Sequence, residues 1–139
     1  MAVVAVVNDD DGARELVARI IERDGHTAHR VESADAALTL LQAGGVNIAV
    51  FDLVTAGPAA NRNLLAEVRA AMPGSPVRAV LVGRSSGAGL LAWQGGADGF
   101  LVRPFHAREL VQAIDEALAR PDADREAHRR AAITAIAAS

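Results

Sequence analysis

The sequence predicts a doubly wound α/β fold, with a parallel five-stranded sheet covered by helices on both faces. Short apolar runs alternate five times with segments of helical periodicity along the chain. The loops between them are short, and this alternation is typical of a parallel sheet with helices packed on both of its faces. The 139 residues are enough for one such domain with a sizeable core.

The first expected strand is Val3–Val7, an almost continuous apolar run that predicts a strand buried on both faces. It ends in a polar loop that is rich in aspartate. A weaker strand is expected at 27–31. The remaining three expected strands are 46–51, 77–82 and 100–102.

The helices are predicted from apolar residues that recur at spacings of three and four. Gly25 is expected to end the first helix, and Ser33 is expected to cap the second. The fourth is a poor helix, because each interior glycine costs about 1 kcal/mol relative to alanine. The five expected helices are 12–24, 33–43, 59–71, 87–95 and 106–119.

Residues 121–139 lie outside this five-fold unit, so we divide the chain into a domain at 1–120 and a helical tail at 121–139. Pro121 breaks the chain, and Asp122 or Asp124 is expected to cap a further helix. The arginines of this helix form a solvated face, or its apolar face packs on the domain or on a second chain. These tail residues are Arg125, Arg129, Arg130, Ile133 and Ile136.

Composition excludes several classes of function. The chain has no cysteine, which excludes disulfides and thiol catalysis. Aromatic residues make up 3% of the chain and the formal net charge is −3, so neither base stacking nor general affinity for DNA is expected. The apolar start is too short for a membrane span and resembles no signal peptide, which predicts a cytoplasmic protein. The four histidines are scattered, and no pair of them has the spacing of a metal site.

Polar residues follow three of the expected strands. Asn8, Asp9, Asp10 and Asp11 follow the first strand, Asp52 ends the third, and Arg103 follows the fifth. The carboxyl ends of parallel strands meet at one edge, where ligands bind in folds of this class. Clustered carboxylates need a cation, and hard oxygen ligands suit partly hydrated Mg²⁺. A carboxylate beside Mg²⁺ and a fixed cation can accept a phosphoryl group.

These three segments resemble the receiver domain of two-component response regulators. The resemblance covers about residues 3–119 and implies a flavodoxin-like (βα)5 fold. Each motif is weak alone, but three in the right order at the right strand ends are specific. They are residues 6–16, with the acidic loop; residues 50–53, with Gly57 five residues after Asp52; and residues 96–105, which end in Arg-Pro-Phe where the family has Lys-Pro-Phe.

The resemblance implies a role for each residue. Asp52 would be the phosphoacceptor, and Asp9 would be a direct Mg²⁺ ligand. The backbone carbonyl of Val54 would be a further ligand. Asn8 stands where the family has a second acid and would orient a metal-bound water, while Asp10 would compensate in part for the missing charge.

Two departures from the family pattern make this an atypical receiver. Arg103 replaces the family lysine, and its planar guanidinium differs from an ammonium point charge. The family's switch threonine or serine falls at Gly83 with a two-residue gap, or near Leu81 without one, and neither carries a hydroxyl. The hydroxyls of Ser85 and Ser86 reach the site only if the loop is rearranged.

The expected function is to accept a phosphoryl group on Asp52 from a histidine kinase or phosphotransfer protein. Output then passes to a protein partner through the fourth helix, fifth strand and fifth helix, with neither enzymatic turnover nor DNA binding, and a homodimer is possible. A phosphorylation-independent pseudo-receiver is the alternative, in which Asp52 and Arg103 form only a structural ion pair. A flavodoxin-like enzyme is a third interpretation, but the phosphate-loop hydroxyls it requires are missing.

Overall fold

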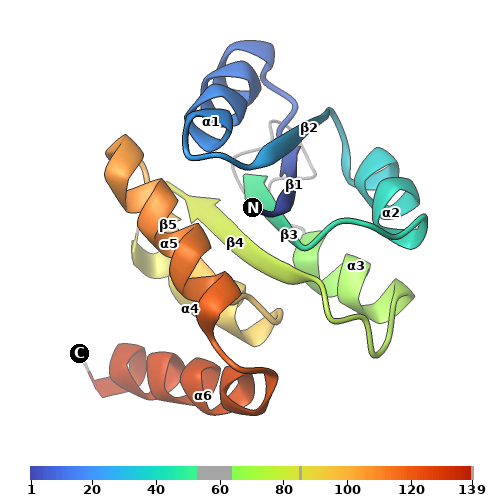
Figure 1. Ribbon diagram of the computed structural model, residues 1–139. Coiled ribbons are helices and arrows are strands. Elements are labelled where there is room, and N and C mark those ends of the chain that lie inside the picture. The colour runs from blue at the N-terminus through green and yellow to red at the C-terminus, as the bar shows by residue number, and fades with distance from the viewer. Residues whose placement is uncertain (53–63, 85, 139) are drawn as a thin grey trace.

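A computed structural model describes residues 1–52, 64–84 and 86–138, and Figure 1 shows its arrangement. Five strands form one sheet in the order β2-β1-β3-β4-β5, and all four neighbouring pairs are parallel. This confirms the predicted fold class. The strands are β1 (Val3–Val7), β2 (Thr27–Val31), β3 (Ile48–Asp52), β4 (Arg78–Gly83) and β5 (Gly99–Val102).

Helices cover both faces of the sheet. On one face, α1 (Asp11–Arg23) and α5 (Ala107–Ala119) pack on a core cluster that includes Val4, Ile48 and Val80. The other face is covered by three helices that enclose a second core cluster, and this two-sided arrangement is the doubly wound one. These three helices are α2 (Ala34–Gln42), α3 (Leu64–Ala71) and α4 (Gly89–Gln94).

Aliphatic residues build both core clusters, as the low aromatic content requires. Residues of β1 alternate between the two clusters, because successive side chains of a strand point to opposite faces. Phe51 is the largest fully buried side chain and lies in the cluster beneath α2, α3 and α4.

Two of the expected elements differ from the structure by more than one residue at a boundary. β3 begins at Ile48 instead of residue 46, because Asn47 exchanges hydrogen bonds with Val3 through its side chain and its backbone N–H. The segment expected as one helix at 87–95 is a 3₁₀ turn, η2 (Ser86–Ala88), followed by the short α4. The start of the helix expected at 59–71 lies outside the described residues.

The edge strand β2 is mostly exposed, with an outward-facing Arg30. Arg30 Nε lies 2.6 Å from Glu15 Oε2, and Arg30 Nη2 lies 3.0 Å from Glu22 Oε1, both on α1. These hydrogen bonds from Arg30, with one from Arg19, lower the pKa of Glu15 to about 2. The charged side chains of α1 therefore hold Arg30 above the edge of the sheet.

The tail forms one helix, α6 (Asp122–Ala138), which packs against α4 (Figure 1). Asp122 and Asp124 lie in its first turn instead of preceding it, so the predicted cap is wrong. Acidic side chains in a first turn still favour the helix, because they face the positive end of its dipole. Among the described helices, none is long and apolar enough to cross a membrane.

Candidate functional site

The predicted site residues converge at the carboxyl edge of the sheet. The parallel register aligns Val7 with Phe51, so the residues that follow β1 lie near the end of β3. β4 lies between β3 and β5, and its last residue, Gly83, pairs with Val102. Asn8, Asp52 and Arg103 are therefore brought together from distant parts of the sequence.

Asp52 is the centre of this cluster. Its residue surface is 9% exposed, and Asn8 Nδ2 donates a hydrogen bond to Asp52 Oδ2 over 2.9 Å. The guanidinium of Arg103 forms an ion pair with the same oxygen. The Arg103 side chain is itself 36% exposed, so the cation reaches the carboxylate from the solvent side.

Asn8 is held by its neighbours in one orientation. Its Oδ1 accepts a hydrogen bond from the Asp10 backbone N–H over 2.8 Å, and its backbone carbonyl accepts one from Arg14 Nη1 over 2.8 Å. The amide therefore presents its N–H to Asp52. The sequence analysis expected Asn8 to orient a water on a metal, whereas here Asn8 contacts the carboxylate directly.

Asp9 and Asp10, which follow Asn8, lie in different surroundings. Asp10 is the N-cap of α1, and its side chain accepts a hydrogen bond from the Ala13 N–H over 2.9 Å. Asp9 is exposed to solvent beside the strand end. Val54, the third predicted ligand position, lies outside the described residues, as do Gly57 and the side chains of Ser85 and Ser86.

The donors at this edge fit Mg²⁺ in part. The carboxylates of Asp9 and Asp52 are the hard oxygen ligands that this ion prefers. The Asn8 amide, as oriented, offers Asp52 a hydrogen-bond donor and no oxygen for a cation. Asp9 and Asp52 are therefore the side chains that would hold the ion.

The end of β4 is closely packed. A Cβ atom built on Gly83 would lie 2.9 Å from Ala88 Cβ and 3.1 Å from two atoms of the Phe100 ring. Leu81, the other candidate for the switch position, is fully buried in the core. The Phe100 ring thus fills the space into which a side chain at Gly83 would project.

An open groove lies next to Arg103, between α1 and the segment that follows β5. Its volume is about 670 Å³, and Leu16 on its wall is exposed. The sequence analysis missed this groove, although an outward leucine on an otherwise amphipathic helix is a signal for it. The lining residues are Ala13, Leu16, Val17, Ile20, Arg84, Arg103, Pro104 and Phe105.

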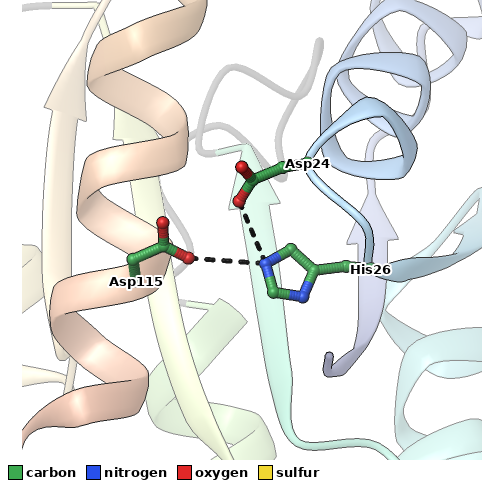
Figure 2. A group of neighbouring side chains, drawn as sticks. All are labelled: Asp24, His26 and Asp115. Carbon is green, nitrogen blue, oxygen red and sulfur yellow. Dashed lines mark hydrogen bonds and ion pairs between the residues drawn. The ribbon is translucent and has the colours of Figure 1, made fainter.

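A second titratable cluster lies away from this edge and joins α1 to α5 (Figure 2). His26 Nε2 lies 3.2 Å from Asp24 Oδ2 and 3.4 Å from Asp115 Oδ1. His26 Nδ1 accepts a hydrogen bond from the Ala2 N–H over 2.9 Å, so in the neutral ring the proton is on Nε2. A metal on Nε2 would displace that proton, so this cluster fits a hydrogen-bonded link better than a metal site.

Comparisons with known proteins identify the family of this chain. The family model described as the response regulator receiver domain matches residues 4–115. The transcriptional regulatory protein GlrR of Escherichia coli (strain K12) is 30% identical over 113 residues, which are 81% of this chain and 25% of that protein. The chain thus spans about a quarter of the length of this curated relative.

Two solved structures share the fold. A CheY-like receiver domain protein from Methanospirillum hungatei JF-1 has a TM-score of 0.72 and 22% identity, covering 85% of this chain and 94% of that one. The response regulator TrrA from Thermotoga maritima, solved in complex with Mg²⁺-BeF, has a TM-score of 0.71 and 22% identity, covering 85% of this chain and 100% of that one.

Proposed function

This chain belongs to the response regulator receiver domain family, and on that basis we propose that Asp52 accepts a phosphoryl group. One observation carries the proposal. Asp52 ends β3 at the carboxyl edge of the sheet, with Asn8 and Arg103 both directed at one of its oxygens. Receiver domains are signalling domains that generally bind Mg²⁺ in an acidic pocket. The carboxylates of Asp9 and Asp52 fit such a pocket.

The transfer we propose is a single displacement at phosphorus. A carboxylate oxygen of Asp52 attacks the phosphoryl group of a phosphohistidine, an O–P bond forms, and the N–P bond breaks. The leaving imidazole keeps the electron pair and takes a proton, and Asp52 becomes an acyl phosphate. Later hydrolysis restores the carboxylate, so the domain is a signalling acceptor and not a metabolic enzyme.

Arg103 and Asn8 have separate parts in this proposal. The Arg103 guanidinium neutralises charge on the phosphoryl oxygens from the solvent side. The Asn8 N–H holds the Asp52 carboxylate in place. Asp9 and Asp52, with the backbone carbonyl of Val54, would hold Mg²⁺, which when bound supplies further neutralisation of phosphoryl charge. Asp10 has no part in the transfer and serves as the N-cap of α1.

The phosphoryl donor is proposed to dock in the groove beside Arg103. The groove is lined mainly by apolar residues of α1 and by Pro104 and Phe105, which suits an apolar helix surface. A histidine kinase or phosphotransfer protein that carries its histidine on a helix would place that residue next to Asp52. Leu16, exposed on this wall, is the first contact to test.

Output is proposed to pass through protein contacts on the face formed by α4, β5 and α5, without direct binding to DNA. A homodimer through this face is one form that such contacts can take. A cytoplasmic location remains part of this proposal.

The test is the intact mass after incubation with Mg²⁺ and acetyl phosphate. The wild-type protein should gain one phosphoryl group and lose it again on hydrolysis. Asp52→Asn should gain none. Asp35→Asn, an exposed acid in the first turn of α2, is the matched control and should behave as wild type. An unmodified wild type, under conditions that phosphorylate another receiver, would overturn the proposal and leave the phosphorylation-independent interpretation.

A further inference from the structure

The tail helix α6 meets the domain mainly through one ridge of side chains, and Arg78 also pairs with Asp122 in its first turn over 3.1 Å. Its partly buried residues recur at spacings of three and four, which places them on a single helix face. None of its residues is fully buried, and none belongs to either core cluster. The ridge consists of Arg125, His128, Arg129, Ala132, Ile133 and Ile136.

The first half of this ridge is held by a buried carboxylate. Asp98 precedes β5 and is 3% exposed. Arg125 donates to both of its oxygens, from Nε to Oδ1 over 2.7 Å and from Nη2 to Oδ2 over 3.0 Å. Arg129 Nη2 donates to Oδ1 over 3.1 Å, and Arg129 Nε donates to the Ala97 carbonyl over 2.8 Å. Two arginines one helical turn apart thus fix the start of α6.

His128 and the second half of the ridge contact α4. The Trp93 ring packs edge-on against His128, with ring centroids 5.5 Å apart. Ile136 lies beside Gly89, because a Cβ atom at this glycine would be at the ordinary contact distance of 3.5 Å from Ile136 Cδ1. The same Cβ atom would lie 3.3 Å from the Phe100 ring. His128 and Ile136 therefore place α6 against α4.

We propose that the surface beneath α6 is a docking site for an amphipathic helix, and that α6 occupies it until a partner helix takes its place. The partner carries two arginines one turn apart for Asp98, followed by aliphatic residues for the surface at Gly89. On the domain, the Asp98 carboxylate selects the two arginines, and the surface at Gly89 selects the aliphatic residues. The inference deepens the proposed output face but does not depend on phosphorylation of Asp52, so the two proposals fail separately.

The connection between α5 and α6 is short and is itself held by Arg78. Only Arg120 and Pro121 separate the two helices, and Arg78 Nη2 donates to the Arg120 carbonyl over 2.6 Å and to Asp122 Oδ1 over 3.1 Å. The proposed exchange therefore releases α6 from these contacts while α5 stays in place. Among the described residues, both core clusters are formed without any residue of α6. A tethered helix competes at a high effective concentration, about millimolar for a short linker, so a free helix binds well only when the tether is weakened.

The test uses a labelled synthetic peptide of residues 121–139 and the full chain carrying Arg125→Ala and Arg129→Ala. This variant loses both of the α6 contacts to Asp98 and should bind the peptide at least about tenfold more tightly than wild type does. A peptide with the same two substitutions is the matched control and should bind neither protein. Binding is measured by fluorescence anisotropy, with circular dichroism to confirm that the variant is folded. Equal binding of both peptides to the folded variant would overturn the inference.

Hydrogen exchange on the wild-type chain tests the same inference without any substitution. The backbone amides of α6 should exchange at least about tenfold faster than those of α5, because α6 opens without the domain. Excess unlabelled peptide should speed exchange in α6 further. Exchange in α6 as slow as in α5, and unchanged by the peptide, would show that α6 is a fixed part of the domain and would overturn the inference.

Discussion

Two aspartates of this domain have buried carboxylates that pair with arginine. Asp52 lies where β3 ends, and Asp98 lies just before β5 begins, so they are at opposite ends of the strands. Asp52 is 9% exposed and is paired with Arg103, whose side chain is 36% exposed, and with the amide of Asn8. Asp98 is 3% exposed and pairs with Arg69, Arg125 and Arg129. It also accepts a hydrogen bond from the Ala79 N–H over 2.9 Å.

The difference lies in how completely each carboxylate is enclosed. Asp98 is surrounded by three arginines from two parts of the chain, α3 and α6, and this suits an anchor. Asp52 meets its cation on the solvent side, where we propose that the phosphoryl donor approaches. Burial beside arginine therefore does not by itself mark a reactive residue; the accessibility of the counter-cation separates the two cases.

The two aspartates should differ most in how much stability is lost when each carboxylate is replaced by an amide. Asp98→Asn should lower the free energy of unfolding by about 3 kcal/mol or more, because buried arginines lose their counterion. Asp52→Asn should lower it by about 1 kcal/mol or less, because the exposed Arg103 regains contact with water. Urea unfolding measures both. Equal losses for the two substitutions would mean that Asp52 is as much an anchor as Asp98.

The cation at Asp52 should matter for transfer more than for folding. Arg103→Ala should slow formation of the phosphoryl adduct with acetyl phosphate by about 100-fold, because the developing charge loses its preorganised cation. Arg103→Lys should keep most of the rate, since the charge remains. Arg84→Ala, on the same groove wall, is the matched control and should change the rate little. The initial rate from intact mass measures this, and an unaffected Arg103→Ala would contradict the role of Arg103.

The packing at the end of β4 can be tested by adding a hydroxyl there. Gly83→Ser should lower the free energy of unfolding by about 1–3 kcal/mol, because its Cβ would crowd Ala88 and the Phe100 ring. Gly83→Ser combined with Phe100→Ala should cost less than the sum of the two single changes. Urea unfolding of the four proteins measures the coupling. Strict additivity would show that Phe100 does not restrict this position.

Acid should weaken the ion pairs of Asp98 with its arginines. Burial raises the pKa of Asp98, but hydrogen bonds from Arg125 and Ala79 and the charges of Arg125 and Arg129 outweigh it, so its pKa lies below 3.8. The unfolded chain then takes up the proton at a higher pH than the folded chain. The stability that Asp98 contributes is present above about pH 4 and is lost as the pH falls through its folded value.

His128 should also make the protein less stable as the pH falls, beginning at a higher pH than Asp98 does. Burial lowers its pKa below 6.5, and nearby Arg120 and Arg129 lower it further against the opposing charges of Asp98 and Glu116. Stability should therefore fall as the pH drops below about 6.5, by less than about 1 kcal/mol. The urea midpoint and Trp93 emission from pH 7.5 to 3 measure this, and His128→Gln should remove only the step near neutrality. A flat profile would contradict both assignments.

Much of the fold could be predicted, because the five-fold alternation leaves little choice of topology. Asp52, Asn8 and Arg103 could be placed because strand ends of a parallel sheet meet at one edge. The register at Gly83 stayed open between two positions, because only the packed structure fixes where β4 ends. The Asp98 cluster had no sequence signal, since its arginines lie about thirty residues away on α3 and α6.

The unpaired edge of strand β2 affects whether this protein aggregates at high concentration. An unpaired strand edge can recruit another chain by adding strands, which leads to aggregation. Here Arg30, held by Glu15 and Glu22, places charge over that edge, and His29 beside it is exposed. Charged edge strands oppose strand addition. Addition of a strand from a second chain at the β2 edge is therefore opposed by the charge held over it.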